Sequence, residues 1–177
     1  MSLTIRVDLS GLNSLLDQLG DQVEAAARPA SQAAAQVLYD EVKGNVAKIG
    51  KKSGNLANSI YQVYSKDQSQ PGRAVYHVSW NAKKAPHGHL VEFGHLQRYK
   101  YYQDPSGKVR PMVRPEAKGK PRPGRRASQA TKDAYYVTLP TPKQVAARPF
   151  IRPAAAKFDK AMAAAKAELL KRLDGKA

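Results

Sequence analysis

The sequence predicts an α+β protein in which a long N-terminal helix and a C-terminal helix pack on a small, mostly antiparallel sheet. Two observations support this class. Helical apolar spacing dominates both ends of the chain, and strand-like alternation occurs at residues 3–9 and on both sides of the polar run SKDQSQPGR. We expect one domain over residues 1–177, with residues 97–144 inserted as a long, extended basic arm.

The N-terminal elements follow from periodicity. Alternation at residues 3–9 predicts a half-buried strand with four apolar side chains on one face: Leu3, Ile5, Val7 and Leu9. Ser10 is a plausible N-cap for a helical run whose apolar positions are Leu12, Leu15, Leu16, Leu19 and Val23. The helical period continues over residues 25–46, and Pro29 either starts a second helix or kinks one long helix. We therefore expect a helix broken near Pro29 and ended by Gly44 or Gly50.

The middle of the chain predicts two antiparallel strands, near residues 60–64 and 75–80, joined by a hairpin loop. The segment APHGHLVEFGH, residues 85–95, fits a short strand or a tight helical turn. A C-terminal helix follows Pro153, with its apolar stripe at Phe158, Met162, Ala165, Leu169 and Leu173.

The arm concentrates charge and proline. Between Arg98 and Lys143 there are 12 basic and 3 acidic residues, a net +9 out of +16 for the chain. Seven of the 12 prolines lie in residues 97–144, so we expect extended chain without a regular helix. Such charge requires an anionic partner. Interleaved tyrosines fit nucleic acid, whereas fixed proline geometry and the lack of a known nucleic-acid-binding fold favour an acidic protein surface, contacted by Arg110, Arg114, Arg122, Arg125 and Arg126.

No motif indicates catalysis. The sequence contains no nucleophile elbow, phosphate-binding glycine loop, dinucleotide fingerprint or zinc-protease helix, so we expect a protein that is not an enzyme. His87, His89 and His95 surround Glu92 and could ligate a metal, but they form no helical i, i+4 pair, and we expect no metal and no cofactor. The absence of cysteine, of a signal-like start and of a long apolar run leads us to expect synthesis in the cytosol without membrane contact.

Three segments in order resemble a known family. GNLANSI (residues 54–60), APHGHLVEFGH (residues 85–95) and ARPFIRPA (residues 147–154), the last followed by an alanine- and lysine-rich helix, are similar to motifs of the tail-completion or neck proteins of lambdoid and related long-tailed phages. Members of that family usually connect the second and third motifs by a shorter loop. The resemblance therefore does not extend to the arm.

The resemblance implies a structural subunit of a ring, expected to be a hexamer, that completes the tail and joins it to the DNA-filled head. Adjacent neck and tail proteins would be its partners, contact with packaged DNA is left open, and the protein would pass from the host cytoplasm into the virion. The alternative is a free basic nucleic-acid-binding protein, which the charge alone would favour.

The second and third motifs supply the candidate structural and interface residues, namely Glu92, Phe93, Gly94, Arg148, Pro149, Phe150, Arg152 and Pro153. A partly buried Glu92 needs a cationic or hydrogen-bonding partner, and Arg148 or Arg152 could provide it. We expect residues 91–94 to pack against residues 149–151 and to bury both Phe93 and Phe150.

Overall fold

The computed structural model describes residues 2–8, 20–50 and 54–174. The chain divides into two compact units, Met1–Phe93 with Ala147–Ala177 (unit 1) and Gly94–Ala146 (unit 2). The helical run predicted after Ser10, from Leu12 to Leu19, lies outside the described residues.

Unit 1 contains a three-stranded antiparallel sheet of order β1-β3-β2. The strands are β1 (Leu3–Asp8), β2 (Ile60–Tyr64) and β3 (Arg73–Trp80), and the register places Leu3 opposite Val78 and Ile60 opposite Trp80. Side chains alternate along a strand, so Tyr76, Val78 and Trp80 of the central strand enter the core together. The predicted N-terminal strand and the predicted strand pair are confirmed.

One long helix, α2 (Gly20–Ile49), covers the sheet. It continues through Pro29, so the predicted break is absent and one long helix is the alternative observed. Proline removes one backbone hydrogen bond, which would go to the carbonyl of Ala25. Burial of Ala26, Ala27 and Ala30 around this position offsets the loss of that hydrogen bond. Gly50, at φ +90°, follows the last residue of α2.

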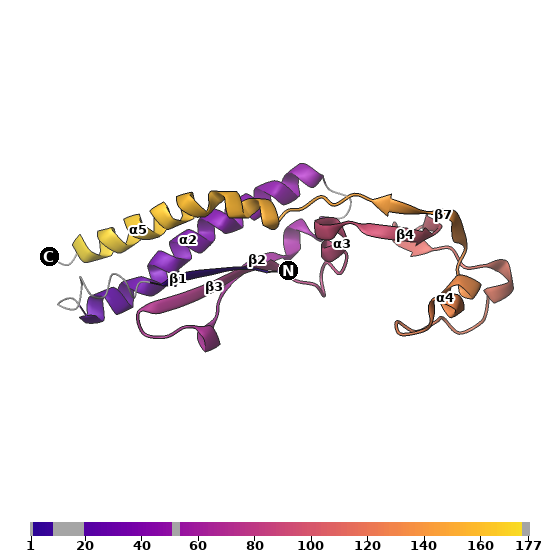
Figure 1. The fold of residues 1–177 in the computed structure, drawn as a ribbon, viewed down its shortest axis with the longest axis horizontal. Helices are drawn as coiled ribbons and strands as arrows, with labels where there is room; N and C mark the ends of the chain where they lie inside the picture. Colours follow the sequence, from indigo (N-terminus) through magenta and orange to yellow (C-terminus); the bar gives the residue numbers. More distant parts are fainter. Residues whose placement is uncertain (1, 9–19, 51–53, 175–177) are drawn as a thin grey trace. The chain divides into compact units, whose positions relative to one another are not determined.

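The C-terminal helix α5 (Phe158–Asp174) follows a 3-10 turn at Arg152–Lys157 and packs on α2 (Figure 1). The layers are therefore sheet, α2 and α5. Alanines line the contact between the helices, which lets their backbones approach closely. Ala165 and Leu169 are buried as predicted, but Phe158 and Met162 are 45% and 39% exposed, because Ala161 supplies the buried position in the first turn instead.

A six-residue helix, α3 (Gly88–Phe93), follows β3. Of the two structures predicted for this segment, the helical turn is the one observed. Gly88 lies against the indole of Trp80 so closely that an added Cβ would stand 2.3 Å from Trp80 Nε1. Trp80 is buried and its ring meets Phe150 edge-on at 5.6 Å between centroids.

Unit 2 contains two two-stranded antiparallel sheets. One pairs β4 (His95–Tyr99) with β7 (Thr138–Val145), and the other pairs β5 (Tyr101–Gln103) with β6 (Val109–Pro111). A short 3-10 turn, Pro115–Ala117, and the helix α4 (Gln129–Tyr135) complete it. The expectation of no regular helix here was wrong, because Ser128 caps α4 by accepting the Thr131 N–H and no proline occurs between Ser128 and Tyr135.

The α+β class is confirmed by the long N-terminal helix, the C-terminal helix and the small antiparallel sheets. None of the helices in the described ranges combines the length and apolar character needed to cross a membrane.

The contact between Gly88 and Trp80 gives a first prediction. We expect Gly88→Ala to lower the free energy of unfolding by about 1–3 kcal/mol, because the buried indole has little room to move away from a new methyl group. Chemical denaturation measures the effect.

Gly44→Ala is the matched control. Gly44 lies within α2 and nothing lies within 4 Å of its added Cβ, so this substitution should raise stability by about 0.5–1 kcal/mol. Equal effects of the two substitutions would contradict the role assigned to Gly88.

Candidate functional site

The centre of unit 1 is a carboxylate clasp between α3 and the segment before α5. Glu92 has no exposed surface, and its Oε2 accepts hydrogen bonds from the backbone N–H groups of Phe150 (2.7 Å) and Ile151 (3.0 Å). Its Oε1 accepts from the backbone N–H and the Nε–H of Arg152, at 3.1 and 3.2 Å. These groups, Glu92 with residues 150–152, are called the Glu92 clasp below.

Two further bonds close the clasp. Arg152 Nη2 donates to the carbonyl oxygen of Glu92 at 2.7 Å, and the backbone N–H of Arg148 donates to the carbonyl oxygen of Val91 at 2.8 Å. The side chain that pairs with Glu92 is thus Arg152, one of the two candidates from the sequence. Arg148 contributes its backbone.

Burial raises the pKa of Glu92, but the amides of Ile151, Phe150 and Arg152 and the Arg152 side chain outweigh it, so the pKa lies below the ordinary value of 4.5. The carboxylate therefore stays ionised at neutral pH. A buried anion of this kind is stable because every acceptor position faces a donor.

Phe150 is held from three sides. Its N–H binds Glu92 of α3, its carbonyl oxygen accepts from Asn45 Nδ2 of α2 at 3.2 Å, and its ring is fully buried against Trp80 of β3. One residue thereby connects α2, β3 and α3. Asn45 was not among the residues predicted from the sequence, although a polar residue on the buried side of an alanine-rich helix indicates such a contact.

Phe93 does not share this burial. It is 48% exposed, and the guanidinium of Arg152 lies over its ring at 5.1 Å from the centroid. The expectation that both phenylalanines would be buried was wrong for Phe93, because residues 88–93 are helical. Successive side chains of a helix differ by about 100°, so once Glu92 faces inward Phe93 faces out. Gly94, at φ +71°, follows this turn, and Pro153 is the second residue of the 3-10 turn Arg152–Lys157.

Unit 2 is organised around an arginine. Arg114 Nε donates to the carbonyl oxygens of Asp133 (2.9 Å) and Tyr136 (3.1 Å), and the backbone N–H of Arg114 donates to Tyr135 O at 3.0 Å. Arg114 was expected to meet a partner molecule. In the structure its side chain instead joins the end of α4 to the strand segment at residue 113.

Tyrosines pack beside Arg114. Tyr136 is buried, and its ring lies 5.2 Å from Tyr99 and 4.9 Å from Tyr135 between centroids. Tyr99 Oη donates to Asp133 at 2.8 Å, which with the bond from Gln129 lowers the pKa of Asp133. These three tyrosines belong to the packing of unit 2. Tyr101 and Tyr102 remain exposed.

The basic side chains of unit 2 divide into two groups. Arg110 pairs with Asp104 at 2.7 Å, and Arg122 donates to Tyr136 Oη at 2.9 Å. Within unit 2, all of which is described, eight exposed basic side chains make no hydrogen bond or ion pair: Arg98, Lys100, Lys108, Lys118, Lys120, Arg125, Arg126 and Lys143. Of the five predicted arm contacts, Arg125 and Arg126 belong to this second group, and contact of any of the five with a partner stays a prediction.

The histidines near Glu92 do not form a metal site. Among the residues that the structure describes, no group of three or more His, Cys, Asp or Glu side chains is placed to hold an ion. The Glu92 carboxylate is fully used by backbone amides and Arg152.

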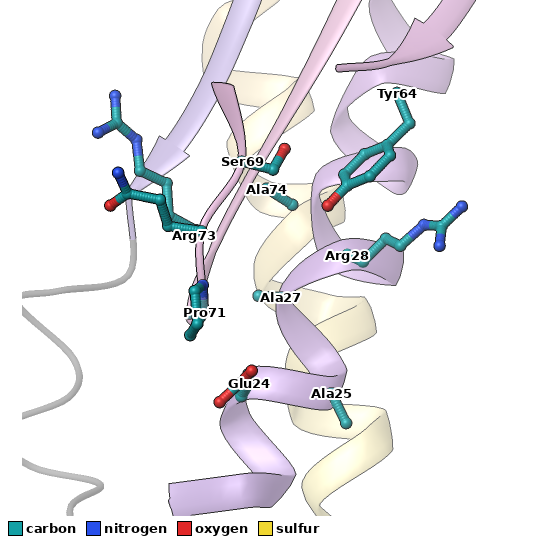
Figure 2. Close-up of a pocket in the computed structure, with 11 residues that line it drawn as sticks. Glu24, Ala25, Ala27, Arg28, Tyr64, Ser69, Pro71, Arg73 and Ala74 are labelled. Atoms are coloured by element: carbon teal, nitrogen blue, oxygen red, sulfur yellow. The ribbon is translucent and has the colours of Figure 1, made fainter. Parts of the chain in front are cut away.

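A groove of about 620 Å³ lies between the first turns of α2 and the β2–β3 hairpin, with Arg28 and Tyr64 on one side and Pro71 and Arg73 on the other (Figure 2). The Arg28 guanidinium stacks on the Tyr64 ring at 4.4 Å. Ser69 Oγ donates to Ser65 O and accepts the Val75 N–H, so it is not positioned as a nucleophile. Among the described residues that line this groove, Glu24 is the one carboxylate, and no histidine or cysteine accompanies it as a catalytic partner.

Residues 11–94, just under half of the chain, match a family model described as "Bacteriophage HK97-gp10, putative tail-component". Over this range the chain resembles a phage tail component. The match contains α2, β2, β3 and α3, and so includes Glu92 but not residues 150–152 or unit 2. No curated protein and no solved structure matches the chain significantly.

The clasp gives a second prediction. We expect Glu92→Gln to lower the free energy of unfolding by about 2–4 kcal/mol, because the amide NH2 group would oppose backbone donors at a buried position. Glu24→Gln, at an exposed position of α2, is the control and should be nearly neutral. Denaturant unfolding at pH 7 measures both.

The pH dependence separates charge from packing. Because the folded pKa of Glu92 is depressed, the stabilisation is present above the unfolded value of about 4.5 and declines as pH falls through the lower folded value. The stability gap between wild type and Glu92→Gln should therefore narrow below pH 4.5. A gap that stays constant down to low pH would contradict an ionised clasp.

Arg114 gives a third prediction. Arg114→Ala should speed amide hydrogen exchange across residues 94–146 by about 10- to 100-fold, since losing its bonds to the backbone removes about 1–3 kcal/mol from local stability. Arg125→Ala with Arg126→Ala removes more charge but should leave exchange unchanged. Equal exchange in the two variants would refute the structural role of Arg114.

Proposed function

We propose that this chain is a structural ring subunit of a tailed-phage neck, which completes the tail and joins it to the DNA-filled head. The observation that supports it most is the match of residues 11–94 to a phage tail-component family. The motif containing Glu92 falls in that range, and its carboxylate binds the third motif, at residues 150–152.

A ring subunit requires a rigid body that repeats its contacts around an axis. Unit 1 has the properties of such a body, because one continuous core contains residues of the sheet, α2 and α5 together with Phe150. We propose a homo-oligomeric ring, with hexameric closure, in the virion. In this proposal no catalytic step is involved, and the exposed surface of unit 1 makes the contacts between copies.

Unit 2 is proposed to be an inserted arm that reaches neighbouring neck or tail proteins. Its first and last strands support an insertion, because β4 and β7 pair with His95 opposite Val145 and Gln97 opposite Lys143. The chain therefore leaves and returns at adjacent positions. An insertion with neighbouring ends can be added to a domain with little disturbance.

The second candidate function is that of a free basic nucleic-acid-binding protein. The net charge of +16 and the exposed cations of unit 2 favour it. A free binder would run as a monomer and bind duplex DNA with steep salt dependence. A neck subunit would be found in purified virions and would form rings.

Removing the gene from its phage tests the proposal. We expect DNA-filled heads and separate tails in lysates, seen by negative-stain electron microscopy, and a loss of infective particles. Normal joined particles without the chain would refute a neck function.

The same strain allows a fourth prediction about unit 2. Residues 98–142 are replaced by an Asn-Gly turn, which can link Gln97 to Lys143 as a two-residue hairpin because these residues face each other across the β4–β7 pair. We expect the thermal unfolding of unit 1 to change little, since its core residues are all retained, while the variant fails to restore infectivity. An unfolded variant would show that unit 2 is needed for folding, and a fully infective one would show that it is not an assembly arm.

A further inference from the structure

We propose that the β5–β6 ribbon of unit 2, residues 101–111, is a docking element for an acidic protein other than a copy of this chain. The inference rests on the proposed role in the phage particle and names the partner of unit 2. It is drawn from the exposed aromatic groups of the ribbon, from the hydrogen bonds that hold its turn, and from charge.

The ribbon and the residue after it carry four exposed apolar or aromatic side chains close together in the sequence. Tyr101 is 47%, Tyr102 45% and Val109 60% exposed, and Met112 just beyond β6 is 39% exposed. Tyr99, Tyr135 and Tyr136, by contrast, stack on one another. Tyrosine, methionine and arginine are the residue types enriched in protein–protein interfaces.

The turn of the ribbon is held by the Asp104 carboxylate. It accepts hydrogen bonds from Ser106 Oγ (2.6 Å), the Lys108 N–H (2.9 Å) and Arg110 Nε (2.7 Å), which lower its pKa to about 2. Gly107, at φ +78°, permits the reversal. Tyr101 and Tyr102 are therefore displayed on an ordered backbone, which reduces the entropy lost when a partner binds.

The arrangement of the tyrosines disfavours nucleic acid. Neighbouring strand residues point to opposite faces, so Tyr101 and Tyr102 cannot form one platform for successive bases. Tyr101 lies opposite Pro111, and Gln103 lies opposite Val109, so that face presents few donors for base edges. It fits an apolar depression on a protein.

Two lysines beside the ribbon indicate that the partner surface is acidic around its apolar depression. Lys100 and Lys108 flank the ribbon and are exposed, and their side chains make no hydrogen bond or ion pair within unit 2, all of which is described. The three acidic residues of unit 2 are already engaged, Asp104 with Arg110, Glu116 with Arg114, and Asp133 with Tyr99. Carboxylates around the apolar depression must therefore come from another molecule.

A second copy of the chain does not supply these carboxylates. Unit 2 holds +9 of the total +16, so unit 1 is left with +7. Glu92, one of the acids of unit 1, is buried in its own clasp. Both units of a neighbouring copy would repel the ribbon at long range, and the partner is therefore a different, acidic protein.

Site-specific photo-cross-linking in assembled particles tests the proposal. The full chain, with p-benzoylphenylalanine in place of Tyr101, which lies on the face shared with Pro111 and Val109, complements the gene deletion, and purified virions are irradiated and analysed by mass spectrometry. We expect a cross-link to an acidic segment of another virion protein. The same group in place of Tyr61, a 40% exposed tyrosine of β2 in unit 1, is the control and should not link to that segment.

A binding measurement completes the test. With the cross-linked protein purified, Tyr101→Ser should weaken binding by about 30-fold, the size of an interface hot spot, and Tyr61→Ser should not. Lys108→Glu should weaken binding as well, and more strongly at low salt.

The outcomes separate this inference from the proposed function. Cross-links from position 101 to a copy of the chain, to DNA or to a basic protein would overturn the inference and leave the neck function standing, as would the absence of any cross-link. Virions that lack the chain altogether would overturn both.

Discussion

Three consecutive backbone N–H groups, at residues 150–152, point at one buried carboxylate, and the arrangement of unit 1 depends on that contact. Glu92 must be ionised to accept all of them, and it can be ionised inside the protein because those amides and Arg152 replace water. The segment between the sheet and α5 has no strand or helix pairing of its own at this point. Its backbone hydrogen bonds therefore come from a side chain.

The need for such a fixed point follows from the composition of the helices. The contact between α2 and α5 is rich in alanine, and alanine contributes little buried area per residue and little shape to define a register. Two of the largest fully buried side chains, Phe150 and Ile151, belong to the segment whose backbone the clasp holds. Asn45 of α2 also donates a hydrogen bond to Phe150 O, which fixes α2 relative to the segment that precedes α5.

Periodicity was sufficient for the elements of unit 1, because both periods reflect burial on one face. The strand at residues 3–8, the β2–β3 pair and the helix at residues 158–174 were all predicted from it. Periodicity did not predict which side chain faces the core in the single helical turn at residues 88–93. A two-residue motif such as Glu92-Phe93 does not reveal which side chain enters the core unless the helical state is known, and tertiary contacts selected the carboxylate over the phenyl ring. The break expected at Pro29 failed for a related reason, since packing outweighed local propensity.

Unit 2 could not be predicted from the same signals, because apolar burial contributes little to it. Only Ala117 and Tyr136 are buried among its apolar residues, and the backbone is held by Arg114, Asp104, Asp133 and stacked tyrosines. A composition rich in proline and charge indicates disorder because it cannot form a hydrophobic core. Hydrogen bonds from a few charged side chains can nevertheless order the backbone when no such core is present. A structure built in this way can keep eight exposed cations unpaired at little cost to its own packing, since the residues that hold the backbone are not the ones that give the surface its charge. Folding and recognition in unit 2 therefore use different members of the same residue type: Arg114 acts on the backbone, whereas Arg125 and Arg126 remain exposed for a partner.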